Sequence, residues 1–158
     1  MARIVIADAG PLIAFANVDA LSVLRALFSE LYVTEAVKDE CFGKPGIDTK
    51  RIEVAIDEGW LVLSPRTGAG QLSPSLGLGE SDSIRLACDN QENSLLIIDD
   101  RLARRYALKQ GLNIVGTVRL LDLAEQQGLI VSAEQSICEM ASVGYRISVE
   151  LLMQIRAK

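Results

Sequence analysis

Short apolar runs alternate with longer amphipathic segments along most of the chain. The runs are rich in Val, Ile and Leu, and in the longer segments the apolar residues recur every three or four positions. Continuous apolar runs are typical of buried strands, and the wider spacing is typical of helices with one buried face. The pattern predicts strands at residues 3–7, 31–33, 60–63, 95–98 and 113–115.

The segments between these strands are predicted to be helical. Pro11 opens the first of them, because proline is tolerated in the first turn of a helix, and Thr34 is placed to cap another. Further helices are expected at residues 19–28, 52–56, 80–90 and 102–108 and in the C-terminal third. Strands that are joined by helices run parallel in one sheet. We therefore expect the α/β class, as a three-layer α/β/α sandwich with a central, mostly parallel sheet.

Size and composition favour one domain over residues 1–158. Of the 158 residues, 49% are hydrophobic, which is enough to bury a substantial core. The N-terminus does not resemble a signal peptide, and no apolar stretch approaches the length of a membrane span. The three cysteines form no CxxC pair, so we expect them to be reduced and mostly buried. These features predict a cytoplasmic protein that does not associate with membranes.

The absence of histidine narrows the chemistry. It removes the commonest general base, the Ser-His and Cys-His nucleophile pairs, and His-containing zinc sites. An enzyme is left with carboxylates, a lysine or tyrosine base, or a hard cation bound by oxygen ligands. The net charge of −5 argues against nucleic-acid binding by the overall field, but it is compatible with a local basic strip.

Carboxylates stand where predicted strands end and helices begin. Asp8 and the pair Asp99 and Asp100 follow two buried strands, and parallel sheets bind ligands beyond the carboxyl ends of their strands. Helix capping alone would also explain each of these acids. Glu40 lies on the helix after the second strand, where a solvated surface acid is the alternative interpretation.

Two more acids, Glu80 and Asp82, fall in the first turn of a helix, where the helix dipole favours negative charge in any case. Residues two apart on a helix diverge by about 200°, so only one of them is expected to face a cluster. Asp99 and Asp100 present the same choice. Clustered carboxylates repel one another unless a cation neutralises them, and a hard divalent ion held by them would activate water beside a phosphate.

Three acid-containing stretches carry a pattern that is found in a known family. They are Asp8–Ile13 (DAGPLI), Gly79–Ile84 (GESDSI) and Leu96–Arg101 (LIIDDR). Further support comes from Gly116-Thr117, from Leu120-Leu121 through Gly128-Leu129-Ile130, and from Gly144–Ser148. In their order and spacing these motifs resemble the PIN-domain family, in its bacterial and archaeal VapC-like branch. The resemblance covers almost the whole chain.

The resemblance implies a four-acid site that binds Mg²⁺ or Mn²⁺, made of Asp8, Glu40, Asp82 and Asp100. Asp82 is preferred to Glu80 because the family's third acid directly precedes small and apolar residues. Asp100 is preferred to Asp99 because the last acid comes just before a helix. Glu80 and Asp99 are the reserve candidates. Asp99 could also orient one of the metal-binding side chains through a hydrogen bond without binding the metal itself.

The function that the resemblance implies is hydrolysis of RNA phosphodiester bonds by a metal-dependent endoribonuclease. Many relatives are toxins of a toxin–antitoxin pair, so an antitoxin protein and a homodimer are the expected partners. The leucine-rich helices from Leu120 onward would serve equally well as a dimer interface or as core.

Three basic residues, Arg101, Arg104 and Arg105, lie on the predicted helix that starts at the site, where they could hold the phosphates of RNA. An ordinary solvated helix face explains them equally well. Two positions depart from the family pattern, since Gly10 and Ile98 stand where many relatives have a hydroxyl residue. A missing hydroxyl near each acid could weaken the orientation of water or metal.

Two other functions remain open. The departures at Gly10 and Ile98 favour a catalytically silent PIN-like module that binds RNA or a protein partner without divalent-dependent cleavage. A phosphatase-like hydrolase would use Asp8 as the nucleophile, because an Asp after the first strand can form a phosphoryl intermediate. Gly10 stands where that mechanism requires a second Asp, which disfavours it.

Overall fold

A five-stranded parallel sheet lies at the centre of the protein. In the computed structural model, which describes residues 3–145, its strands have the order β3-β2-β1-β4-β5, and neighbouring strands are parallel. The strands are β1 (Ile4–Ala7), β2 (Leu31–Thr34), β3 (Leu61–Ser64), β4 (Ser94–Ile97) and β5 (Ile114–Val115). All five predicted strands are present, within a few residues of their predicted bounds.

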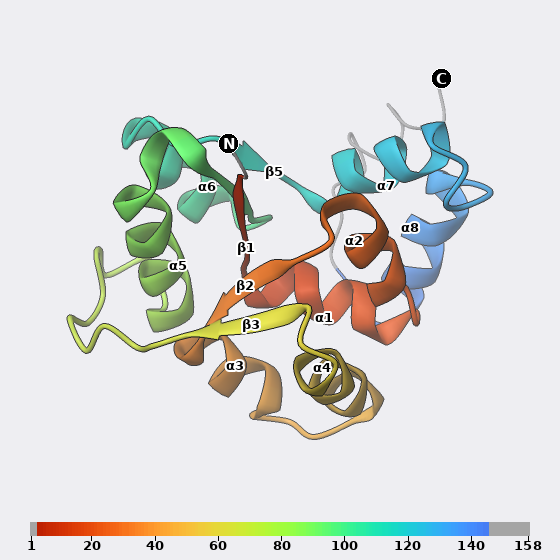
Figure 1. The fold of residues 1–158 in the computed structure, drawn as a ribbon, viewed down its shortest axis with the longest axis horizontal. Coiled ribbons are helices and arrows are strands. Elements are labelled where there is room, and N and C mark those ends of the chain that lie inside the picture. The colour runs from red at the N-terminus through yellow and green to blue at the C-terminus, as the bar shows by residue number, and fades with distance from the viewer. Residues whose placement is uncertain (1–2, 146–158) are drawn as a thin grey trace.

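Helices cover both faces of the sheet (Figure 1). They are α1 (Ala9–Asn17), α2 (Leu21–Phe28), α3 (Glu35–Phe42), α4 (Ile47–Asp57), α5 (Leu78–Asp89), α6 (Arg101–Lys109), α7 (Thr117–Gln126) and α8 (Ala133–Ser142). In Figure 1, α5 and α6 lie on one side of the sheet, and α1, α2, α7 and α8 lie on the other. The predicted three-layer α/β/α sandwich is therefore confirmed.

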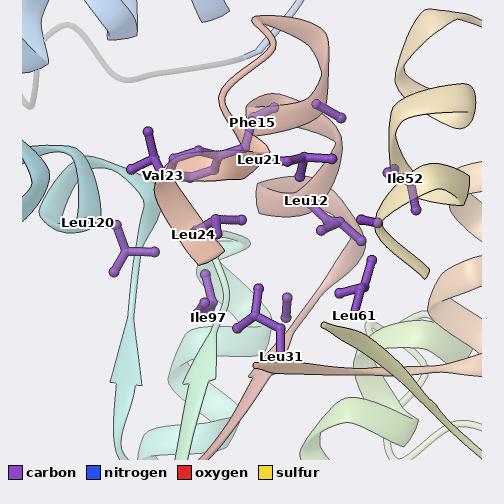
Figure 2. Close-up of a cluster of buried hydrophobic side chains, with 14 of the residues drawn as sticks. Leu12, Phe15, Leu21, Val23, Leu24, Leu31, Ile52, Leu61, Ile97 and Leu120 are labelled. Atoms are coloured by element: carbon purple, nitrogen blue, oxygen red, sulfur yellow. The ribbon is translucent and has the colours of Figure 1, made fainter. Parts of the chain in front are cut away.

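The core consists of two apolar clusters, one on each face of the sheet. Successive side chains of a strand point to opposite faces, so Val5 and Ala7 belong to the first cluster and Ile6 to the second. Figure 2 shows Leu12 and Phe15 of the first cluster converging with residues of other helices and of the strands. Fully burying a large aliphatic or aromatic side chain contributes roughly 1.5–3 kcal/mol, so these clusters fix the sheet edge that carries the acids.

Local signals explain where several helices begin. Thr34 caps α3 as predicted, since its Oγ1 accepts a hydrogen bond of 3.2 Å from the N–H of Val37. The helix expected at 19–28 begins two residues later, because Asp19 has a φ of 55°, outside the right-handed helical region. Helix α5 begins at Leu78 rather than Glu80, which places Glu80 third in the helix.

Some expectations change with the structure. Only Cys41 is buried, whereas Cys88 is half-buried and Cys138 is exposed, so the cysteines are not mostly buried. Leu120 and Leu121 are fully buried in the core of this chain, so these two side chains are not available to a dimer interface. The motif residues 146–148 lie outside the described residues.

Within residues 3–145, no single helix is long and apolar enough to cross a membrane. Only α1 and α2 taken together meet these criteria, and a bend of 120° separates them.

Candidate active site

The acids of β1 and β4 meet at the carboxyl edge of the sheet. The two strands are adjacent and in register, with Ala7 opposite Ile97. The N–H of Asp8 continues the ladder by donating to the carbonyl oxygen of Ile97 at 3.0 Å. Asp99 follows two residues after Ile97, so the sheet itself brings it to the same edge as Asp8, as the sequence predicts.

Asp8 is a buried carboxylate without a full set of partners. The residue is only 5% exposed, and its Oδ1 has no hydrogen-bond partner among the described residues. Although Asp8 precedes α1, it makes no side-chain cap, so capping does not explain its presence. Burial is the main reason that its pKa is raised to about 7, and the negative charges of Glu80, Glu40 and Asp99 raise the pKa further. A hydrogen bond from the N–H of Ala9 acts in the opposite direction and lowers it. The acids therefore lie close enough to act on one another.

Glu40 reaches the site from α3, which packs against α5. Its Oε1 accepts a hydrogen bond of 3.1 Å from the N–H of Gly79 in the first turn of α5. Burial raises the pKa of Glu40, and the hydrogen bond from Gly79 partly offsets this rise. A Cβ atom on Gly79 would lie 2.9 Å from the Cδ of Glu40 and 3.2 Å from a methyl carbon of Val37. Only glycine allows Glu40 to approach the helix so closely.

Replacing Gly79 by Ala is expected to displace the carboxylate of Glu40. The new methyl group overlaps the carboxylate of the exposed Glu40 and comes within 3.2 Å of a methyl carbon of the buried Val37, and overpacking of this kind costs roughly 1–3 kcal/mol. We expect a matching loss of stability in urea denaturation, together with weaker binding of divalent ions. The control is Gly10→Ala, because a Cβ at Gly10 meets nothing within 4 Å. Equal stability of the two variants would show that Glu40 does not depend on Gly79.

Glu80, and not Asp82, faces the acid cluster. Glu80 closes the first turn of α5, where its Oε1 accepts a hydrogen bond of 3.0 Å from the N–H of Gly77. Burial raises the pKa of Glu80, and the neighbouring carboxylates of Asp100 and Glu40 raise it further. The structure therefore brings Glu80, the reserve candidate, together with Asp8, Glu40 and Asp100, and does not bring Asp82 there; which acid binds the metal stays a prediction.

Asp82 points to the other side of α5 and is fully engaged there. Its Oδ1 accepts hydrogen bonds of 2.6 Å from the Thr67 hydroxyl and 3.0 Å from Arg85, and its Oδ2 accepts one of 3.3 Å from the N–H of Thr67. Burial acts to raise the pKa of Asp82, but these hydrogen bonds outweigh it and leave the pKa below its usual value. Arg85 also donates to the carbonyl oxygen of Gly70 at 2.5 Å. Asp82 thus fastens the loop 65–77 to α5.

Replacing Asp82 by Ala is expected to destabilise the fold rather than to empty a metal site. The change removes three hydrogen bonds to a side chain that is only 6% exposed and leaves Arg85 short of a partner. Losses of this type amount to roughly 2–4 kcal/mol, measurable by urea denaturation. Asp89→Ala, at an exposed acid on the same helix, should stay within about 0.5 kcal/mol of the wild type. An Asp82→Ala variant of unchanged stability would disprove the fastening role.

Asp99 and Asp100 both reach the cluster, from different directions. Asp99 accepts hydrogen bonds from the N–H of Thr117 at 2.8 Å and from its hydroxyl at 2.5 Å, which ties the start of α7 to the site. Asp100 caps α6, since its Oδ2 accepts a hydrogen bond of 3.0 Å from the N–H of Ala103. The charge of Asp99 acts on Asp8, and that of Asp100 acts on Glu80. The choice between the two as metal ligand stays a prediction.

The basic residues of α6 line an open groove beside these acids. The groove is lined by Asp99, Arg101, Arg104, Arg105, Leu108 and Lys109. Arg104 differs from the other cations, because its Nη1 donates to the carbonyl oxygen of Ile98 at 2.8 Å and so supports the fold. Lys109 was not among the predicted residues, although its place four residues after Arg105 in the helix could have identified it.

The residues of the cluster fit a hard divalent ion in their chemistry. As they stand, no three acidic or cysteine side chains within residues 3–145 are grouped closely enough to hold a metal ion. The unpartnered, buried Oδ1 of Asp8 is nevertheless an oxygen that lacks a positive partner, with three acids acting on it. Oxygen-only donors of this kind suit Mg²⁺ and Mn²⁺. Asp8, Glu40, Glu80 and the Asp99–Asp100 pair are therefore the residues that would hold the ion.

The sheet order and the helical layers define a three-layer α/β/α protein of the PIN-like class, with acidic residues at the carboxyl edge of the sheet. A family model described as a PIN domain matches residues 4–158, so the chain belongs to the PIN-domain family. The members of this family are generally nucleases.

Among solved structures, the chain is similar to a PilT N-terminus domain protein from the hyperthermophilic archaeon Sulfolobus solfataricus P2. The two share 16% sequence identity with a TM-score of 0.43, over 77% of this chain and 92% of the other. No curated protein sequence matches the chain.

Proposed function

We propose that this protein is a divalent-metal-dependent endoribonuclease that hydrolyses phosphodiester bonds in RNA. The observation that carries the proposal is the buried Asp8. Its Oδ1 has no hydrogen-bond partner among the described residues, and the negative charges of Glu40, Glu80 and Asp99 raise its pKa. Such an arrangement is unfavourable without a cation and is typical of sites that bind one. Membership of a family of nucleases supports the same chemistry.

The chain's own residues have distinct parts in this mechanism. Asp8 presents its free oxygen from the end of β1, and Glu40 is held against the start of α5 by the N–H of Gly79. Glu80 completes the α5 side, and Asp99 is oriented by Thr117. A bound Mg²⁺ or Mn²⁺ would supply the Lewis acid that activates water and stabilises charge on the phosphoryl group.

The two departures from the family pattern do not block the site sterically. Gly10 has no neighbour within 4 Å of a Cβ position, so it leaves space beside Asp8. Ile98 is fully buried in the apolar cluster on the α5 and α6 side of the sheet, away from water. These observations exclude a steric block but do not replace the missing hydroxyl groups, so the cleavage test decides between the enzyme and the silent module.

The test is incubation of purified protein, freed of any co-purified partner, with labelled structured RNAs in Mg²⁺, Mn²⁺ or excess chelator. Cleavage is expected with either ion and none with the chelator. Glu80→Gln is expected to lose cleavage while keeping its fold. RNA binding without cleavage in any ion would reject the nuclease in favour of the silent module.

We extend the proposal to a role as a VapC-like toxin. In this role an antitoxin would occlude the site, and the active form would be a homodimer. This role is supported by the resemblance of the motifs around Asp8, Asp82 and Asp100 to that branch of the family. Expression of the active protein without its neighbour gene is expected to arrest growth, and Asp8→Asn is expected to relieve the arrest.

A further inference from the structure

Two distant parts of the chain meet at the side chain of Asp99. Thr117 is the first residue of α7 and is fully buried. Its N–H and its hydroxyl both donate to Asp99, at 2.8 and 2.5 Å. The side chain of Tyr145, which follows α8, hydrogen bonds with Asp99 and with Thr117. The donors to Asp99 therefore come from the start of α7 and from the turn after α8, which carry none of the clustered acids.

The turn that ends α8 sets the position of Tyr145. Gly144 has a φ of 105°, in the left-handed region that favours glycine. The N–H of Gly144 donates to the carbonyl oxygen of Ala141 at 3.2 Å. The N–H of Tyr145 donates to that of Met140 at 3.0 Å, which completes a Schellman motif. The ring of Tyr145 packs against the first apolar cluster, while its hydroxyl reaches Asp99.

Gly116 allows Asp99 to lie close to the backbone before α7. A Cβ atom on Gly116 would lie 3.0 Å from the Oδ1 of Asp99 and 2.9 Å from the Nη1 of Arg104. Any larger residue would displace the carboxylate or the guanidinium group. The pairs Gly116-Thr117 and Gly144-Tyr145 thus have the same arrangement, in which a glycine shapes the backbone and the next residue supplies a hydroxyl group to Asp99.

These donors leave Asp99 little freedom to rotate. A carboxylate has about four acceptor sites, and Thr117 and Tyr145 together occupy three of them. One site remains for a further partner. The negative charge of Asp99 acts on the buried Asp8, which follows the adjacent strand. Hydrogen bonds that orient a carboxylate in this way strengthen metal binding at a site.

We propose that Tyr145 is a positioning residue of the metal site, whose hydroxyl acts with Thr117 to hold the carboxylate of Asp99 in place beside Asp8. The inference rests on the proposed function for its metal ion. Tyr145 acts through Asp99 and does not bind the ion itself. The turn after α8 therefore completes a site whose acids lie at β1, β4, α3 and α5.

The test measures binding of Mn²⁺ to the full chain by titration calorimetry, without RNA. Tyr145→Phe removes the hydroxyl and keeps the ring in the core. Loss of a group that orients a metal ligand lowers metal affinity about 10- to 100-fold, and we expect a loss of about 10-fold here. Tyr106→Phe is the matched control, because Tyr106 is a half-buried tyrosine that packs against the second apolar cluster. It should bind Mn²⁺ as the wild type does.

A double-mutant cycle in excess chelator tests the contact between Tyr145 and Asp99 without a metal. The fall in the urea midpoint caused by Tyr145→Phe is expected to be smaller in the Asp99→Asn background than in the wild type, because the hydrogen bond to a charged group is already lost there. A role in packing alone would give an equal fall in both backgrounds and an unchanged Mn²⁺ affinity. Either of these two results would overturn the inference.

The outcome is separable from that of the proposed function. If the wild type cleaves RNA with Mg²⁺ but Tyr145→Phe binds Mn²⁺ as tightly as the wild type, only the role of Tyr145 is rejected. If Tyr145→Phe weakens Mn²⁺ binding but no ion supports cleavage by the wild type, the role of Tyr145 stands and the nuclease is rejected. A wild type that binds no Mn²⁺ rejects both.

Discussion

Asp8→Asn is expected to abolish divalent-dependent RNA cleavage while making the metal-free protein more stable at pH 8. The variant keeps the shape of the side chain but removes the charge that the proposed ion requires. Metal-ion catalysis contributes several kcal/mol, so we expect a loss of about 10³-fold or more in cleavage rate. The gain in stability has the opposite sign because the charge of Asp8 is buried among other acids.

The size of that gain follows from the pKa of Asp8. A rise from 3.8 to about 7 corresponds to a cost of roughly 4 kcal/mol for the ionised side chain at pH 8. The side-chain amide of the variant has N–H groups that need hydrogen-bond acceptors, and leaving them without acceptors in a buried position costs roughly 1–3 kcal/mol of stability. We therefore expect a net stabilisation of roughly 1–3 kcal/mol in urea denaturation at pH 8 with chelator.

Asp57→Asn is the matched control for this experiment, because Asp57 is an exposed acid at the end of α4. It should change neither cleavage nor stability by more than about 0.5 kcal/mol. An Asp8→Asn variant that cleaves RNA at the wild-type rate would refute the metal site. A loss of stability at pH 8 would show instead that the charge of Asp8 has a favourable partner.

The sheet and its acidic edge could be predicted from sequence because both depend on local patterns. The apolar run before Asp8 and the one before Asp99 are continuous and rich in β-branched residues, which identifies buried parallel strands. Once two such strands are adjacent, the residues after them meet at one edge, whatever else the chain does. The positions of Asp8 and Asp99 follow from this alone.

The choice between Glu80 and Asp82 could not be settled in the same way. It depends on where α5 begins, and the helix starts at Leu78, two residues before the predicted start. Boundaries are the least certain part of a sequence-based prediction, and a rotation of 200° separates the two side chains. Thr67, which binds Asp82 together with Arg85, also comes from a loop whose path no periodic pattern predicts.

Long-range contacts also limit what a pattern can say about single cations. Arg101, Arg104 and Arg105 look equivalent as a basic cluster at the start of a helix. Only the path of the chain after β4 reveals that the carbonyl oxygen of Ile98 binds Arg104. Lys109 lines the same groove one helical turn after Arg105, although the basic cluster in the sequence does not include it.

The metal-free protein is expected to lose stability as pH rises from about 4 to 8, and Mg²⁺ is expected to restore it. The pKa of Asp8 is raised from 3.8 to about 7 in the folded state, so in that window the folded state binds more protons than the unfolded state. The contribution of Asp8 is fully present below about pH 4 and is lost as pH rises through about 7, a change of roughly 4 kcal/mol. Glu40 and Glu80, whose pKa values are also raised, act in the same direction.

Urea denaturation at several pH values, with chelator or with saturating Mg²⁺, measures both effects. An ion present at about 100 times its dissociation constant adds roughly 2.7 kcal/mol, and it binds only the ionised acids. The stabilisation by Mg²⁺ should therefore be large near pH 8 and small near pH 5, and Asp8→Asn should remove most of it. Asp82, whose pKa is lowered, makes stability fall as pH decreases, but only near or below pH 4. It therefore does not mask the loss of stability expected between about pH 4 and 8. A stability that rises with pH in chelator would contradict the buried, unpartnered state of Asp8, and a Mg²⁺ effect of equal size at both pH values would place the ion elsewhere.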